Sequence, residues 1–154
     1  MLPSTLLADA DLFISYLTGD VLEPLFATVV NETRTGSVEL LVSSEVYDDI
    51  ITALRSQSIP ISRVMEFVSD MRKIPHRALP VTADISTDAL RIYQEHGGPR
   101  RLHYFDSYHV ATARNYGASL LTSDKYVIRN AGRLRIDVID VRNLKPTGRT
   151  EEHS

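Results

Sequence analysis

Residues 102–127, LHYFDSYHVATARNYGASLLTSDKYV, are the stretch of sequence that decides the fold. They predict a helix that begins near an acid, then a short buried strand, then a second acid. Asp106 lies in the first turn of the predicted helix, and Gly117 is typical of a helix end. Residues 119–122 form an apolar run that Asp124 follows at once. Because ligands gather at the carboxyl ends of parallel strands, Asp124 is expected at a functional site, and Asp106 can reach the same edge.

Apolar runs alternate with helical patterns along the rest of the chain. Further strands are predicted at residues 4–9, 38–42, 79–82 and 135–141. Helices are predicted at about residues 11–18, 21–32, 43–56, 59–73, 84–95 and 126–130. Asp11 is predicted to cap the first helix, Ser43 or Ser44 the third and Asp84 the fifth, because short polar side chains accept free backbone N–H groups. This alternation predicts an α/β domain with a mostly parallel sheet.

Length and composition favour one globular domain. The 154 residues are expected to form a domain at 1–141 and a loose polar tail at 142–154. Hydrophobic residues make up 43% of the chain, which is enough for a real core, and the absence of Cys excludes disulfides and thiolate metal sites. The apolar runs are too short to cross a membrane, and the amino terminus does not resemble a signal peptide. We therefore expect no membrane association and a cytoplasmic location.

Basic residues concentrate near the carboxyl terminus. Residues 125–149 contain seven Lys or Arg and two acids, although the whole chain has a net charge of −3. A basic end on an acidic body can meet phosphate, but a solvated surface of mixed charge explains the same composition. Charge alone favours the second interpretation.

Four acids occupy corresponding positions in the predicted elements. Asp9 ends the first strand, Asp49 lies early in a helix, Asp106 begins a helix and Asp124 follows a strand. Asp48 is a rival to Asp49, but adjacent helical residues point about 100° apart, so only one of them can easily face the core. Asp49 is the better candidate because it shares a side with the apolar residues of its helix.

Carboxylates that meet in one cleft need a partner. Each repels the others and raises their pKa values, and burial of a charge without a partner is costly. A divalent cation relieves both effects, and a site of oxygen ligands alone favours Mg²⁺ or Mn²⁺. Such a site can activate a water molecule and stabilise charge on a phosphoryl group.

Neighbouring polar residues are weaker candidates. Ser123 is equally well explained as a group that orders a metal-bound water or as a turn hydroxyl. His103 and His109 flank Asp106 and one of them could act as a general base, although surface or packing roles are more common. Arg100 and Arg101, in the loop before Asp106, could hold an RNA backbone or could be an exposed pair with no such role. Three aromatic residues could stack on bases or pack in the core: Tyr104, Phe105 and Tyr108.

Three segments of the chain resemble the PIN-domain ribonuclease family, and within it the VapC-like toxins. They are LLADADLFISYL from residue 6, VSSEVYDDI from residue 42 and FDSYHVATARNYGASLLTSD from residue 105. The resemblance covers residues 6 to about 141. It places the four acids of the family on Asp9, Asp49, Asp106 and Asp124, with Asp49 where the family usually has Glu.

The resemblance implies a three-layer α/β/α sandwich and divalent-metal-dependent cleavage of RNA. Asp9, Asp106 and Asp124 would hold the Mg²⁺ or Mn²⁺, with Asp49 bound directly or through water. Many such toxins form homodimers and are held inactive by a small antitoxin protein, so an antitoxin and a second copy of the chain are expected partners. Other members mature ribosomal RNA instead.

Two alternatives come from other classes of protein. The sequence Asp9-Ala10-Asp11 also occurs at the start of haloacid-dehalogenase-type phosphatases, but that family would continue with Gly-Thr, and here Leu12-Phe13 follow. The second alternative is a module that binds RNA or protein without turnover. The complete set of acids counts against it.

Overall fold

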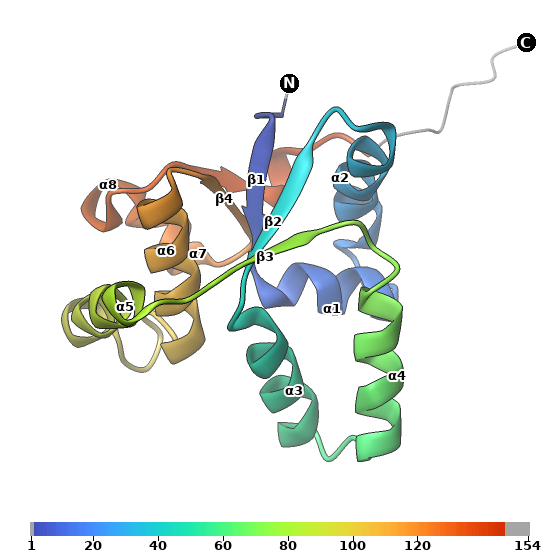
Figure 1. Ribbon diagram of the computed structural model, residues 1–154, viewed down its shortest axis with the longest axis horizontal. Helices are drawn as coiled ribbons and strands as arrows, with labels where there is room; N and C mark the ends of the chain where they lie inside the picture. The colour runs from blue at the N-terminus through green and yellow to red at the C-terminus, as the bar shows by residue number, and fades with distance from the viewer. Residues whose placement is uncertain (1, 147–154) are drawn as a thin grey trace, which may run out of the picture.

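A parallel β-sheet forms the centre of the computed structural model, which describes residues 2–146 (Figure 1). Within those residues the sheet has five strands, all parallel, in the order β3-β2-β1-β4-β5. The strands are β1 (Thr5–Ala8), β2 (Glu39–Ser43), β3 (Arg77–Leu79), β4 (Ser119–Thr122) and β5 (Val138–Asp140). The predicted α/β class with a parallel sheet is confirmed.

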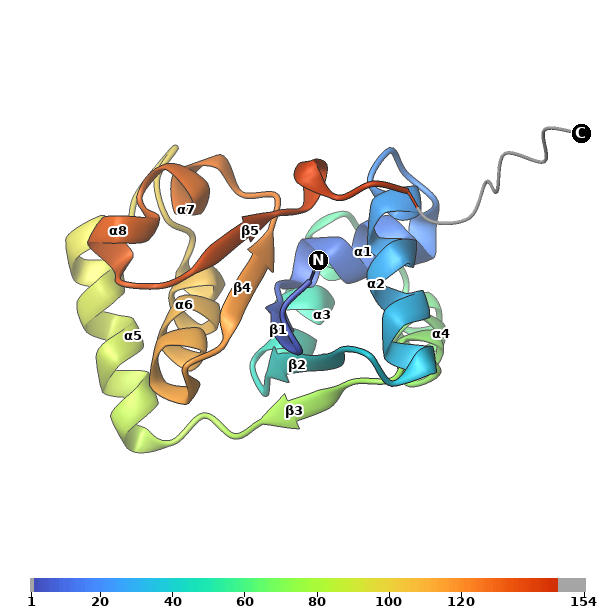
Figure 2. The ribbon, with the colours of Figure 1, turned by 90° about the horizontal axis from the view of Figure 1, so that it is seen from above.

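Helices cover both faces of the sheet. One face carries α1 (Ala10–Thr18), α2 (Glu23–Thr35), α3 (Val46–Ser56) and α4 (Ile61–Met71). The other face carries α5 (Ala83–His96), α6 (Tyr104–Tyr116), α7 (Lys125–Arg129) and α8 (Ala131–Leu134). Figure 2 shows α2 and α4 on one side of the strands and α5, α6 and α8 on the other. This is the three-layer sandwich that the family resemblance implied.

Alternation along the central strands builds the two cores. Leu6 and Leu7 are adjacent in β1 and fully buried, but they belong to different hydrophobic clusters. Leu121 and Leu120 of β4 divide in the same way. Successive side chains of a strand point to opposite faces, so an apolar run in a central strand supplies both layers at once.

Several predicted helix caps are wrong. Asp9, not Asp11, caps α1, and its carboxylate accepts the backbone N–H of Leu12 at 3.4 Å. Thr82, not Asp84, caps α5. Local sequence did not distinguish these residues, because each pair is two positions apart and all four have an oxygen that can cap.

The third predicted cap fails for a different reason. The hydroxyl of Ser43 accepts the N–H of Glu45 at 3.2 Å, which closes the turn before α3. The hydroxyl of Ser44 accepts the N–H of Val81 at 3.0 Å, which ties this turn to the chain after β3. Helix α3 therefore begins at Val46 with no side-chain cap.

The two edge strands are shorter than or displaced from their predictions. Strand β3 ends at Leu79 instead of starting there, because Pro80 has no N–H for a sheet and Thr82 is already the cap of α5. Strand β5 begins at Val138, since Arg135 has φ 56° and ψ 46° and closes α8, a helix that the sequence did not indicate.

The last described residues continue the folded domain. A 3₁₀ turn, η1 (Val141–Asn143), follows β5, and Leu144 packs against the core. The hydroxyl of Thr28 donates to the carbonyl of Lys145 at 3.0 Å. Residues 147–154 of the predicted polar tail lie outside the described residues. Across residues 2–146 no single helix passes the length and hydropathy test for a membrane span, and α1 and α2 pass it only as a pair bent by 105°.

Strand order places the candidate acids in one region. From β1 the chain builds the sheet in one direction through β2 and β3, and from β4 it builds in the other direction through β5. The carboxyl ends of β1 and β4 therefore form a topological switch point, where open parallel sheets leave a crevice for ligands. Asp9 directly follows β1, and Asp124 comes two residues after β4.

Candidate functional site

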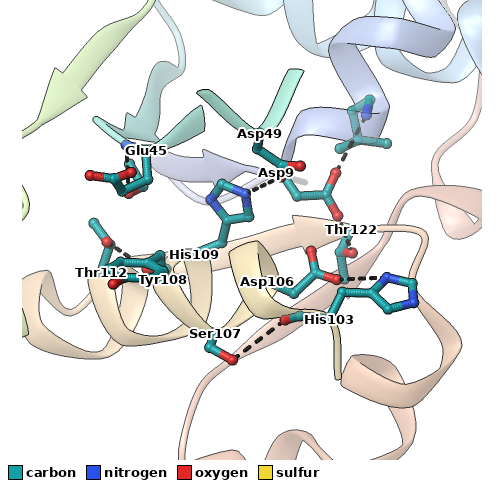
Figure 3. Close-up of polar contacts among 12 residues, drawn as sticks. Asp9, Glu45, Asp49, His103, Asp106, Ser107, Tyr108, His109, Thr112 and Thr122 are labelled. Atoms are coloured by element: carbon teal, nitrogen blue, oxygen red, sulfur yellow. Dashed lines mark hydrogen bonds and ion pairs between the residues drawn. The ribbon is translucent and has the colours of Figure 1, made fainter. Parts of the chain in front are cut away.

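Asp9 lies at the base of the site between the ends of β1 and β4. Its side chain is buried, with 3% of the residue exposed. One carboxylate oxygen accepts the N–H of Leu12, and the other accepts the hydroxyl of Thr122, the last residue of β4 (Figure 3). Both oxygens are thus held by elements that the sheet itself positions.

The surroundings of Asp9 disfavour its charged form. Burial raises the pKa of the Asp9 carboxyl well above its ordinary value, and the negative charges of Asp11 and Asp106 raise it further. The hydrogen bond from Thr122 and the positive charge of His109 act in the opposite direction. Without a cation beside it, this carboxyl holds its proton more tightly than a free aspartic acid does.

Asp49 is held by a histidine from another helix. Asp49 lies in the first turn of α3, and its carboxylate is 2.8 Å from Nε2 of His109 on α6. The neighbouring Asp48 is exposed, so the geometry favours Asp49 over its rival. Figure 3 shows the His109 ring between Asp49 and the body of α6.

His109 was expected to have a surface or packing role, and its contact with Asp49 was missed. The ring is buried, with 1% of the residue exposed, and its Nδ1 has no hydrogen-bond partner among residues 2–146. Burial lowers the pKa of His109, but the hydrogen bond to Asp49 and the charges of Asp49, Asp106 and Asp9 outweigh it and raise the pKa above its ordinary value. The partners are 60 positions apart, so neither has a local signal.

Asp106 faces the same space from the first turn of α6. Its carboxylate is 3.5 Å from Nδ1 of His103, the residue before that helix. The hydrogen bond to Asp106 raises the pKa of His103 to about 9; burial opposes this shift, and the charges of Asp106, Asp124 and Asp11 support it. His103 is exposed, so it carries positive charge at the mouth of the site.

Asp124 and Thr122 close the fourth side. Asp124 caps α7 by accepting the N–H of Val127 at 2.9 Å, and its own N–H donates to the Thr122 hydroxyl at 3.0 Å. Thr122 therefore links Asp9 to Asp124. Ser123, which the sequence left as either a group that orders a metal-bound water or a turn hydroxyl, lies half-buried between the two, and its role stays a prediction. The contact with Asp9 belongs to Thr122.

Asp11 is a fifth acid of the site. Burial raises its pKa, and the next causes are the negative charges of Asp106, Asp49 and Asp124. The sequence interpretation treated Asp11 as a cap and therefore left it out. Because Asp9 takes the cap position of α1, the Asp11 side chain is left free to face the other carboxylates.

The donor atoms suit a divalent cation. Two groups of three residues each hold possible ligand atoms within 4.8 Å of one another, and both contain Asp106. One group adds Asp49 and His109, and the other adds His103 and Asp124. Carboxylate oxygens are the ligands that Mg²⁺ and Mn²⁺ prefer, so Asp49, Asp106 and Asp124 are the members of these groups that suit such an ion. The raised pKa of Asp9 points the same way, because a bound cation would favour its charged form.

The two arginines expected to hold RNA do not both face this cluster. Arg101 donates to the carbonyl of Glu95 at 3.0 Å, and its guanidinium lies 6.0 Å from the centre of the Tyr126 ring. Arg100 is exposed in a left-handed backbone conformation, with φ 59°. Arg101 thus braces the loop before α6, and the role of the pair in RNA binding stays a prediction.

The aromatic residues near Asp106 differ in burial, and a role in stacking on bases stays a prediction. Tyr104 is 45% exposed and makes edge-to-face contacts with Tyr93, Phe105 and Tyr108. Phe105 is half-buried. The Tyr104 hydroxyl also lies 3.1 Å from the Tyr108 hydroxyl, so this ring packs against its neighbours on α5 and α6.

This molecule is an all-parallel α/β sandwich with carboxylates at its switch point, the edge where such folds bind their ligands. Residues 6–133 match the PIN domain family model. The chain therefore belongs to the PIN-domain family, the nuclease family that its motifs resemble. No curated protein matches the sequence.

Solved structures share the fold at low sequence identity. VapBC2 from Rickettsia felis, solved bound to a DNA fragment from its promoter, aligns with a TM-score of 0.63 and 11% identity over 88% of this chain and 97% of that chain. VapBC-1 from nontypeable Haemophilus influenzae aligns with a TM-score of 0.60 and 13% identity over 90% of this chain and 98% of that chain. VapC20 from Mycobacterium tuberculosis, described as a Sarcin-Ricin loop cleaving toxin, aligns with a TM-score of 0.57 and 15% identity over 75% of this chain and 86% of that chain.

The alternative classes are not favoured. In the phosphatase alternative Asp9 would attack phosphorus, but here both its oxygens accept hydrogen bonds and its side chain is buried. A pure binding module does not explain why Asp9 and Asp11, whose pKa values are raised by burial and by neighbouring carboxylates, lie together at this edge of the sheet.

Proposed function

We propose that this protein is a Mg²⁺- or Mn²⁺-dependent ribonuclease that hydrolyses RNA phosphodiester bonds as the toxin of a toxin–antitoxin pair. The single observation that carries the proposal is the convergence of Asp9, Asp11, Asp49, Asp106 and Asp124 at the switch point of a PIN domain. Carboxylates from four separate segments of the chain meet where a parallel sheet places its ligands.

The carboxylates of Asp9, Asp106 and Asp124 would bind the metal ion directly. Asp49 would bind it either directly or through a water molecule. When bound, the cation supplies a water molecule of lowered pKa and stabilises charge on the phosphoryl group. Groups of the protein itself position these ligands. The Thr122 hydroxyl donates to the carboxylate of Asp9 and accepts the backbone N–H of Asp124.

Two histidines balance the negative charge of the cluster. His109 holds Asp49 at 2.8 Å, which compensates for a side chain one methylene shorter than the Glu usual in the family. His103, exposed and protonated at neutral pH, offers positive charge at the mouth, where the anionic oxygens of a diester would approach.

The test is cleavage of single-stranded RNA with Mn²⁺. Wild type should cleave, and Asp106→Asn, which keeps the shape of the side chain but removes its charge, should lose at least about 100-fold in rate, as when a group acting on the transition state is removed. Asp48→Asn is the matched control, because Asp48 is exposed on the same helix as Asp49. Equal rates for wild type and Asp106→Asn would refute the assignment.

The toxin role rests on the comparisons. Solved neighbours include a toxin–antitoxin complex from Klebsiella pneumoniae and VapBC complexes, so we propose a small antitoxin partner and, as in many of these toxins, a homodimer in the cytoplasm. Induced expression in a bacterial host should arrest growth, and Asp106→Asn should not. A ribosomal RNA maturation enzyme, the other role in the family, would leave growth unaffected and change precursor RNA ends instead.

A further inference from the structure

A second charged cluster lies among α5, α6 and α8. Helices α5, α6 and α8 enclose a hollow, which we call the arginine groove, and Figure 2 shows α8 next to α5. Four arginines line it against two acids, Asp88 and Glu95. The arginines are Arg91, Arg114, Arg133 and Arg135.

One of the four arginines is already engaged in the fold. Arg114 binds both carboxylate oxygens of Asp88, at 2.6 and 3.3 Å, and donates to the carbonyl of Leu134 at 3.1 Å. The other three are exposed and form no ion pair within residues 2–146. Asp88 is thereby neutralised, so the groove presents three unpaired positive charges, of Arg91, Arg133 and Arg135, against the one negative charge of Glu95.

A buried contact joins the groove to α7, the helix that begins at the acidic site. Nδ1 of His96, a groove residue with 2% exposure, is 2.8 Å from the hydroxyl of Tyr126. Tyr126 is the second residue of α7, the helix that Asp124 caps. The groove and the acidic cluster therefore approach α7 from two directions.

The positive charges of nearby arginines act on the His96 ring. Burial lowers the pKa of His96, the charge of Glu95 opposes the shift, and the charges of Arg133, Arg101 and Arg114 lower it further. Three guanidinium groups are thus within electrostatic reach of one buried ring.

Arg135 has an unusual backbone for its residue type. It ends α8 at φ 56°, a position where helices usually have glycine, and its side chain lines the groove. A side chain in this conformation is less favourable than glycine, so Arg135 carries some backbone strain.

We propose that Arg91, Arg133 and Arg135 bind a backbone phosphate of the RNA strand whose cleaved bond lies at the acidic cluster, an inference that rests on the ribonuclease function proposed above. Five carboxylates repel a polyanion, so binding needs cations close to them. Guanidinium groups fork onto phosphate oxygens, and these three are free to do so. Arg100 and Arg101, the candidates from sequence, lie in the loop between the two clusters.

The experiment measures binding apart from cleavage. The full chain is titrated in EDTA against a fluorescein-labelled oligouridylate of about 12 nucleotides, a length suited to single-strand sites, with anisotropy read at several salt concentrations. In Arg133→Gln/Arg135→Gln the slope of log K against log salt should fall in magnitude by about 0.7 per lost phosphate contact, and Kd at low salt should rise about 10-fold. Arg63→Gln is the matched control, since Arg63 is an exposed arginine of α4, on the other face of the sheet.

Arg135→Gly separates binding from folding. Glycine relieves the left-handed backbone, so this variant should melt no lower than wild type while its Kd for the RNA rises. If its melting temperature falls and its Kd is unchanged, Arg135 serves the fold alone and the proposal is overturned.

Other outcomes distinguish the possible occupants and the two proposals. If poly-L-glutamate displaces the RNA as well as unlabelled polyuridylate does, the groove fits an acidic protein segment and the RNA assignment is overturned. If wild type cleaves RNA with Mn²⁺ but the double variant binds RNA as tightly as wild type does, the groove is not an RNA-binding site and the proposed ribonuclease function is supported. If the double variant loses RNA binding although wild type does not cleave RNA, the groove is supported as an RNA-binding site and the proposed nuclease function is refuted.

Discussion

Removal of the Thr122 hydroxyl gives the most informative test of how the site is built. Thr122→Val keeps the shape of the side chain but loses the hydrogen bond to the Asp9 carboxylate and the acceptor for the Asp124 N–H. A hydrogen bond to a charged group contributes about 1.5–3 kcal/mol, and a backbone donor left without a partner costs about 1 kcal/mol where water can still reach it. Asp124 is half-buried, so the lower figure applies to its N–H.

The free energy of unfolding should therefore fall by about 2.5–4 kcal/mol. For a chain of this size that corresponds to a melting temperature lower by roughly 5–16 °C. Thr122→Ser, the matched control, keeps the hydroxyl and loses one buried methyl group, which costs about 1 kcal/mol. Both variants are compared by urea and thermal unfolding in EDTA at neutral pH. If Thr122→Val proves as stable as Thr122→Ser, the hydroxyl does not hold the two acids and the reasoning is refuted.

Four further predictions follow from the same contacts. Burial raises the pKa of Asp9 in the folded state, so its proton stabilises the folded protein at acid pH, and this stabilisation is lost as pH rises from about 3.8 through the folded pKa. In urea unfolding with EDTA, Asp9→Asn should therefore be more stable relative to wild type at pH 8 than at pH 4. An equal difference between the two proteins at both pH values would contradict this prediction. Mn²⁺ at about 100 times its Kd should add about 2.7 kcal/mol to wild-type stability, seen as a higher melting temperature that Asp106→Asn largely loses; an equal shift in both would place the metal elsewhere. Asp88→Ala should cost about 1–3 kcal/mol in urea unfolding, because it breaks a two-pronged, half-buried ion pair with Arg114, without changing the Mn²⁺ shift. Phe26→Ala should cost about 3–5 kcal/mol, since Phe26 is fully buried between Phe13 and Tyr16, and a loss below 1 kcal/mol would mean that this core repacks freely.

Local sequence was enough to locate the acids at strand ends. Asp9 and Asp124 follow apolar runs directly, and the order of strands and helices then places both at one edge of a parallel sheet. Asp106 was found for a similar reason, because a helix start after a loop is visible in the sequence. These positions depend on patterns that span fewer than about ten residues.

The residues that connect the acids had no such signal. His109 reaches Asp49 across 60 positions and Thr122 reaches Asp9 across 113, so both contacts depend on how whole elements pack. Asp11 was misassigned because the choice between it and Asp9 as helix cap is settled by where β1 ends. Ser123 and Thr122 are both small hydroxyls, and only the strand register decides which of them faces Asp9.

The central place of β1 has a consequence for synthesis of the protein. Strand β1 pairs with β2 soon after both are made, but its other neighbour, β4, lies more than a hundred residues further along the chain. A nascent chain that stops before β4 has Asp9, Asp11 and Asp49 without Thr122 or Asp124, and so cannot complete the acidic cluster. The acidic cluster can therefore be completed only after β4 and the residues that follow it have been synthesised.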